Sequence, residues 1–249
     1  MVSGLAFLAT AVSSLFAEAT LVRYLRRRKP HELAWTIALA MFAVASAALA
    51  TGASTGWDNG TFRAFYLLGA VLNVPWLALG TVYLLFGTKA GRRVQWGLVL
   101  FTGLAIGVML SAPMTAVPRD SIPVGKNVFD VLPRVLAAAG SGLGALVIFG
   151  GAVYSAARFA RDRSTPGSAR LAAANALIAL GTIVLSSGGL VQGIVGHDEA
   201  FALSLAIGIS VIYSGFLVST YEPRAVNVAP ASTIHAQLAA EHLPDQRAG

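Results

Sequence analysis

The chain has 249 residues, of which 56% are hydrophobic and only 12% are charged, whereas a soluble domain carries roughly 25% charged residues. This composition excludes a water-soluble protein, so we attribute the net charge of +7 to Lys and Arg beside membrane spans and expect no nucleic-acid partner. The absence of cysteine excludes disulfides, thiolate catalysis and Cys-ligated zinc or iron–sulfur sites.

Seven stretches of the chain are apolar and long enough to cross a membrane. A helix needs about 20 apolar residues to cross about 30 Å of hydrocarbon. In chain order the windows are 2–22, 33–52, 64–86, 94–114, 132–154, 169–192 and 200–220. The sequence therefore predicts an all-α integral membrane protein, with seven transmembrane helices in a domain that spans 1–221.

The Lys and Arg residues between the windows predict the orientation, because such residues collect on the cytoplasmic side. With the N-terminus outside, 14 of the 18 lie in the cytoplasm: Arg23, Arg26, Arg27, Arg28, Lys29, Lys89, Arg92, Arg93, Arg158, Arg161, Arg163, Arg170, Arg224 and Arg247. The outer residues are Arg63, Arg119, Lys126 and Arg134. We therefore expect the N-terminus outside and the C-terminus in the cytoplasm. The Ala-, Gly- and Arg-rich composition suggests a bacterial cytoplasmic membrane.

The first span contains Glu18, the only acidic residue inside any of the seven windows. A carboxylate at this depth pairs with a cation or takes part in proton transfer. Arg23 follows little more than one helical turn later. The sequence therefore predicts either an ion pair near the cytoplasmic interface or a proton-binding group at Glu18.

The third span carries an asparagine and a proline near its middle. Pro75 has no backbone N–H, so it should kink the helix and leave the carbonyl of Val71 without its donor. Asn73 adds an amide that can both donate and accept hydrogen bonds. We predict a solute site with Pro75 as hinge; the alternative is that Asn73 bonds a neighbouring helix and Pro75 makes a structural kink. The predicted solute-binding residues are Asn73, Trp76, Tyr66 and Tyr213.

The longest connection, about 113–131, lies on the predicted outer side. It contains Pro113, Pro118 and Pro123, and proline disfavours helix. The connection is either an extended cap over the outer end of the bundle or an idle surface loop.

Spans 1–3 and 5–7 enter the membrane in the same direction, which permits a parallel repeat of three, one and three helices. The segment Arg23–Arg28 after span 1 is echoed by Arg158–Arg163 after span 5. Phe62 and Gly69 have the same spacing as Phe201 and Gly208. A true repeat would make span 4 a linker and place a pocket between spans 3 and 7. The alternative is that basic residues follow any span that runs inward.

The repeat plan is similar to that of the SWEET sugar transporters, which have comparable length and the same topology. Those transporters carry proline-containing motifs in their first and fifth spans. Here Pro30 and Pro166 lie in the connections, so the resemblance is limited to topology.

Residue types missing from the spans limit the chemistry. The lysines Lys29, Lys89 and Lys126 all lie in connections, which excludes a retinal Schiff base in the last span. The histidines His31, His197, His235 and His242 also lie outside the windows, so neither haem nor an intramembrane metal has ligands. We therefore expect no cofactor, no metal and no catalytic residue, and these absences disfavour an enzyme.

Two functions remain open. One is a facilitator or transporter of a small neutral solute through a polar pocket at mid-depth. The other is a non-transporting membrane sensor or an accessory subunit, suggested by glycine-rich helix faces and basic loops that also suit anionic lipid headgroups. The expected partners are membrane lipids, a small-molecule solute, and a partner subunit or second copy of the chain. The polar tail 222–249, on the cytoplasmic side, is expected to be disordered.

Overall fold

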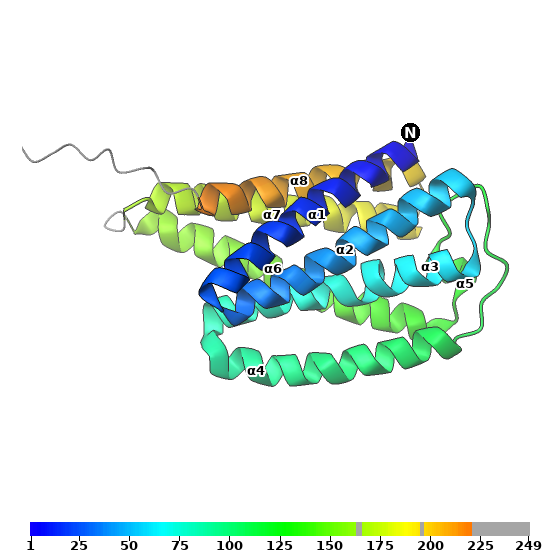
Figure 1. Ribbon diagram of the computed structural model, residues 1–249, viewed down its shortest axis with the longest axis horizontal. Coiled ribbons are helices and arrows are strands. Elements are labelled where there is room, and N and C mark those ends of the chain that lie inside the picture. The colour runs from blue at the N-terminus through cyan, green and yellow to red at the C-terminus, as the bar shows by residue number, and fades with distance from the viewer. Residues whose placement is uncertain (163–165, 195–196, 221–249) are drawn as a thin grey trace, which may run out of the picture. The chain divides into compact units, whose positions relative to one another are not determined.

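The computed structural model describes residues 1–162, 166–194 and 197–220 (Figure 1). Every regular element in these ranges is helical: α1 (Val2–Arg27), α2 (Pro30–Thr55), α3 (Asn59–Phe65), the π-helix η1 (Tyr66–Leu72), α4 (Asn73–Ser111), α5 (Gly125–Val128), α6 (Val131–Arg161), α7 (Ser168–Ile194) and α8 (Asp198–Thr220). The predicted all-α class is confirmed. The predicted tail, 222–249, lies outside the described residues.

Six helical stretches in the described chain are long and apolar enough to cross a membrane. Their outward faces carry large apolar side chains, such as Leu100, which is 75% exposed, and Leu146, which is 69% exposed. A soluble monomer rarely exposes an apolar surface of this extent. The chain is therefore a multi-pass membrane protein, and one of the six stretches, Asn59–Ser111, contains the predicted window 64–86 and most of the predicted window 94–114.

The stretch Asn59–Ser111 reverses direction at Gly87 (Figure 1). Gly87 interrupts α4 with φ 78° and ψ −179°, a conformation that is accessible to glycine because it lacks a Cβ. Beyond it the chain runs back along its own first half. The indole Nε1 of Trp76 donates to Thr102 Oγ1 at 3.1 Å, and the Tyr83 hydroxyl donates to Gln95 Oε1. The two halves form an antiparallel helical hairpin.

A tight turn joins α1 to α2. Arg28 adopts the left-handed conformation with φ 53°, and its N–H donates to the Tyr24 carbonyl at 2.7 Å. Pro30 then occupies the first turn of α2, where its missing N–H has no helical partner to lose. As a result α2 begins before the predicted window 33–52, and Glu32 lies inside the helix.

Each long helix packs against its neighbours through apolar side chains and glycines. Contacts join α1 to α2, α2 to α4, α4 to α6, and α6 to α7. A Cβ at Gly181 of α7 would lie 2.8 Å from the Gly208 carbonyl of α8. The ring of Phe16 on α1 lies 4.9 Å from those of Tyr213 and Phe216 on α8. This order of contacts brings the last helix back to the first.

Glycines on α6 allow it to approach η1 and the first half of α4 closely. A Cβ at Gly140 would lie 2.8 Å from the Val71 carbonyl oxygen, and one at Gly144 would lie 2.9 Å from Val74 Cγ1. These glycines have a packing role, as small residues do in membrane helices.

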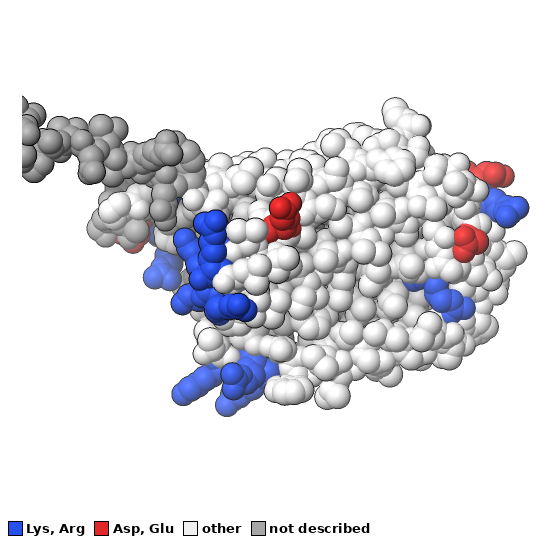
Figure 2. All heavy atoms as spheres, viewed as in Figure 1, with Lys and Arg blue, Asp and Glu red and all other residues white. Residues whose placement is uncertain are grey.

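Basic residues gather at one end of the helices (Figure 2). This end, here called the basic end, holds the last turns of α1 and α6, the first turns of α2 and α7, and the turn at Gly87 (Figure 1). Its described Lys and Arg residues are Arg23, Arg26, Arg27, Arg28, Lys29, Lys89, Arg92, Arg93, Arg158, Arg161 and Arg170. Only Arg63, Arg119, Lys126 and Arg134 of the described chain belong to the opposite half.

The opposite end is covered by residues 112–130, here called the outer segment. Its backbone is tied down, since Trp57 N–H donates to the Arg119 carbonyl at 3.2 Å and Ile122 N–H donates to Asp198 Oδ2 at 2.8 Å. The side chains of Ile122, Val128 and Phe129 are buried. The outer segment is thus packed into the bundle rather than lying idle on its surface.

Helix α3, which begins at this end, has a side-chain cap. Asp58 accepts hydrogen bonds from the N–H groups of Gly60 and Thr61 at 2.7 and 2.9 Å, and from the Thr61 hydroxyl at 2.7 Å. The bonds from Thr61 are the main reason that the pKa of Asp58 lies below its usual value. The cap therefore contributes stability at neutral pH, and that contribution is lost as the pH falls through the lowered pKa.

Gly144→Val should destabilise the protein, because a Cβ there would lie 3.0 Å from the backbone of Val74. Overpacking of this kind costs about 1–3 kcal/mol, so the midpoint of thermal unfolding in detergent should fall by several degrees. Gly142→Val is the matched control, since nothing lies within 4 Å of a Cβ at that position. Equal midpoints for the two variants would contradict the packing of α6 on α4.

Candidate functional site

The helical ladder is irregular just before Asn73 and Pro75. The N–H of Asn73, which directly follows the π-helix η1, donates to the carbonyl of Leu68 five residues back. The α-helix resumes at Asn73, so α-helical spacing assigns the carbonyl of Val71 to Pro75, which has no N–H to donate. The hydroxyl of Ser141 on α6 donates to the carbonyl of Ala70, one residue earlier, at 2.6 Å. A Cβ at Gly140 of α6 would lie 2.8 Å from the Val71 carbonyl oxygen, so α6 lies close to this irregular stretch.

Asn73 is buried, with 7% of its surface exposed. No hydrogen bond joins its amide to any residue in the described chain, so the alternative of a bond to a neighbouring helix has no support there. Its chain neighbours Val71 and Leu72 belong to an apolar cluster against which Met41 packs. The amide atoms of Asn73 are not among the fully buried unpaired atoms of the described chain, so they are open to a hydrogen bond from a ligand.

The other predicted solute-binding residues lie at different levels. Trp76 is on the same helix as Asn73 and donates to Thr102 within the hairpin. The Tyr66 ring lies 5.0 Å from that of Phe129 of the outer segment. Tyr66, Asn73 and Trp76 therefore lie along one continuous helical stretch, Asn59–Ser111.

Tyr213 belongs to a separate apolar cluster. Its ring lies 4.9 Å from Phe16 on α1 and 6.4 Å from Phe216 on α8. The structure does not bring it together with Asn73, because the neighbours of α8 include α1, a pairing that no local sequence pattern indicates.

Arg23 makes its ion pair with Glu32 and not with Glu18. Arg23 Nε lies 3.1 Å from Glu32 Oε1, and the two side chains are 27% and 1% exposed. The guanidinium also lies over the ring of Phe216, 5.1 Å from its centroid. Glu32 Oε2 is buried without a hydrogen bond. Glu18 is exposed on α1, and its proton-binding role stays a prediction.

Sequence reasoning missed Glu32 because the predicted window of span 2 began at residue 33. The signal was present in Pro30, since proline favours the first turn of a helix and would have set Glu32 inside it. Glu32 therefore joins Asn73 as a buried polar group to be explained.

The described residues contain no group of three or more His, Asp and Glu side chains that could hold a metal ion. No protein-family model matches the chain, and no curated protein matches its sequence. Function must therefore be inferred from the residues and their geometry.

Glu32→Gln should destabilise the protein, because it leaves the guanidinium of Arg23 without its charged partner. Breaking a fully buried pair costs about 3–5 kcal/mol, and the partial exposure of Arg23 should reduce this to about 1–3 kcal/mol. The measurement is thermal unfolding in detergent. Glu18→Gln makes the same charge change at an exposed site and should leave the midpoint unchanged. A similar midpoint for both variants would show that the ion pair contributes nothing.

Proposed function

We propose that this chain is a seven-helix facilitator for a small neutral solute, with the solute bound where η1 meets α4. The observation that carries the proposal is Asn73, a largely buried residue whose amide makes no hydrogen bond in the described chain and which lies between a π-helix and Pro75. Polar groups that make no hydrogen bond within a folded protein and lie among apolar side chains are candidates for contact with a ligand.

The seven-helix topology is supported by the hairpin at Gly87. Its arms, 59–86 and 88–111, are about 42 and 36 Å long at 1.5 Å per residue, and each exceeds the hydrocarbon thickness of about 30 Å. With the basic end in the cytoplasm, the N-terminus lies outside and α8 ends inside. We place the protein in a bacterial cytoplasmic membrane.

The chemistry around Asn73 favours a neutral solute. The nearby side chains of Val71, Leu72 and Met41 are apolar, and a charged solute would lose its hydration there without a counter-charge. The amide offers two donor hydrogens and an acceptor oxygen. These groups suit a solute that carries hydroxyl or amide groups, and Trp76 lies one turn away to pack against its apolar part.

Passage of a solute requires a change in the packed outer end. The outer segment covers Phe62 and Phe65 at this end, and Phe129 stacks on Phe62 with ring centroids 5.5 Å apart. The π-helix is the element best suited to move, because π-helical turns frequently occur at functional sites and can revert to α-helical register. In this proposal Pro75 is the hinge, and no proton is coupled to transport.

The three, one and three repeat remains a proposal. The second half of α4 carries many exposed apolar side chains, including Leu100, Leu104 and Leu110, as a linker helix at the periphery would. The proposed solute site, however, lies in span 3 alone, since Tyr213 of span 7 packs in another cluster.

A second function, a sensor or accessory subunit, is favoured by one observation on the hairpin. A Cβ at Gly103 or Gly107 would have nothing within 4 Å, and both glycines are exposed. Glycines four residues apart let another membrane helix approach closely. A partner subunit or a second copy of the chain would then cover this face.

Asn73→Leu should abolish solute binding, because it replaces the amide with an apolar side chain of similar size. The measurement is native mass spectrometry of protein extracted in mild detergent, followed by uptake into vesicles of the solute identified. Asn175→Leu is the matched control, since Asn175 donates to the carbonyl of Leu171 in its own helix. The wild type and the control should retain a small molecule that Asn73→Leu has lost. Retention by Asn73→Leu would contradict the site, and a bound subunit with no small molecule would favour the second function.

A further inference from the structure

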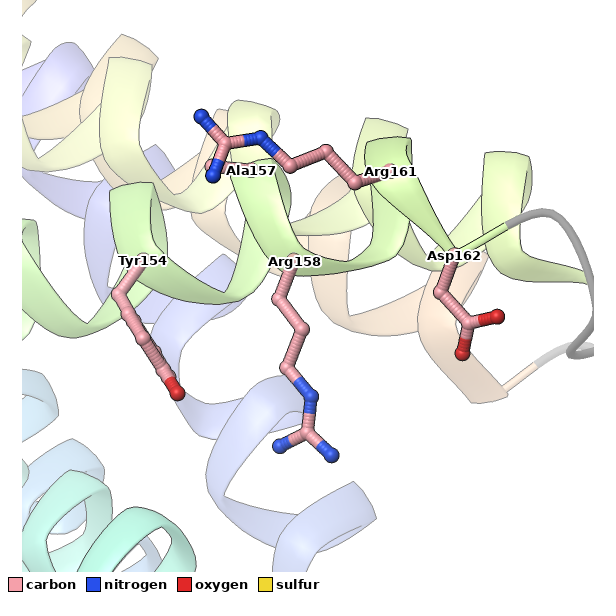
Figure 3. Close-up of a pocket in the computed structure, with 5 residues that line it drawn as sticks. All are labelled: Tyr154, Ala157, Arg158, Arg161 and Asp162. Carbon is pink, nitrogen blue, oxygen red and sulfur yellow. The ribbon is translucent and has the colours of Figure 1, made fainter.

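A hollow of about 430 Å³ lies on the surface of the last turns of α6, at the basic end (Figure 3). It is lined by Tyr154, Ala157, Arg158, Arg161 and Asp162. These positions are three and four residues apart, so they share one face of the helix. Figure 3 shows Tyr154 and Arg158 pointing to the same side of α6, while Arg161 reaches back along the helix toward Ala157.

The hollow lies at the depth of lipid headgroups. No charged residue occurs between Arg134 and Arg158, a distance of about 36 Å along a helix, which is enough to cross the hydrocarbon thickness of about 30 Å. Arg158 therefore stands at the boundary of the hydrocarbon and Arg161 one turn beyond it. Tyr154, which is 60% exposed, lies where tyrosines collect at membrane interfaces.

The helix face that leads from the hollow into the membrane can accept an acyl chain. Leu143, Leu146 and Val147 expose their side chains on α6. Gly150 lies between them and the hollow, and nothing lies within 4 Å of a Cβ at that position. An exposed apolar strip that includes Gly150 therefore runs along α6 up to the guanidinium groups of Arg158 and Arg161.

The neighbouring helix adds to the positive charge at this end. Arg170 stands in the first turn of α7, and its Nε and Nη1 atoms are buried without a hydrogen bond. Asp162 places one carboxylate in the hollow beside the two arginines, so the lining keeps a net positive charge, to which Arg170 adds at the same end.

We propose that this hollow binds the headgroup of an anionic phospholipid, with Arg158 and Arg161 on the phosphate and the Tyr154 hydroxyl as a further donor. Guanidinium groups bond phosphate oxygens in pairs of parallel hydrogen bonds. The acyl chains lie along the exposed strip of Leu143, Leu146 and Gly150. The site is separate from the solute site around Asn73 and does not depend on it.

The test is native mass spectrometry of the detergent-purified full chain titrated with phosphatidylglycerol or with phosphatidylcholine of the same acyl chains. The wild type should retain phosphatidylglycerol selectively, and the double variant Arg158→Ala with Arg161→Ala should bind it about tenfold more weakly or worse. The matched control is Arg92→Ala with Arg93→Ala, which removes the same charge at the same end from two exposed positions and should bind as the wild type does.

Three results would overturn the proposal: equal binding of the two lipids, retained binding in the α6 double variant, or an equal loss in the control. Inorganic phosphate added to the lipid-bound wild type tests whether the site prefers a lipid phosphate or free phosphate. Displacement of the lipid by millimolar phosphate would indicate a site for a soluble anion instead. If the double variant fails to fold, Arg158→Gln and Arg161→Gln replace it. Each single variant should then weaken binding partially, and wild-type binding in both would also overturn the proposal.

Discussion

The need to satisfy backbone hydrogen bonds without water governs the centre of this bundle. Inside a membrane a carbonyl that loses its helical donor must find another within the protein. The π-helix η1 and Pro75 both disturb the α-helical ladder here, and the hydroxyl of Ser141 on α6 bonds one carbonyl of this stretch, that of Ala70, at 2.6 Å. For the hydroxyl to reach, α6 must approach closely, and Gly140 and Gly144 leave the room. The disturbed ladder, the helix contact and the glycines of α6 are therefore linked.

The amide of Asn73 differs from its polar neighbours. The carbonyl of Ala70 accepts a hydrogen bond from Ser141, whereas the amide makes no hydrogen bond in the described chain. The charged groups follow a different pattern. Glu32 and Arg23 pair at the basic end, where α1, α2 and α8 meet, and most other cations lie on the surface around them. The proposed solute site therefore lies away from the charged groups, while the basic end has the positive charge that attracts anionic lipid. This separation supports a neutral solute and a lipid partner at different depths of the protein.

Much of the fold could be predicted from hydropathy, which measures the cost of exposing apolar side chains along the chain. The long helices followed from it, and so did the break between the windows 64–86 and 94–114, within which the chain turns at Gly87. The register of η1 could not, because composition does not distinguish four from five residues per hydrogen bond. The ion pair could not be predicted either. Charged residues mark the ends of an apolar window in a hydropathy profile, whereas Glu32 is buried inside the bundle because Arg23 neutralises its charge. The aromatic neighbours of Tyr213 on α1 and α8 could not be predicted, because contacts between distant helices leave no mark on a single sequence.

The hairpin of α3, η1 and α4 holds the proposed solute site, so its placement in the membrane is the central point to test. Because the chain has no cysteine, single cysteines at exposed Asn59, Thr88 and Ser111 can be labelled without background. An impermeant maleimide applied to intact cells should label Asn59→Cys and Ser111→Cys, and it should label Thr88→Cys only after the membrane is opened. Labelling of all three positions from the same side would contradict a hairpin that crosses the membrane twice, and with it the seven-helix topology.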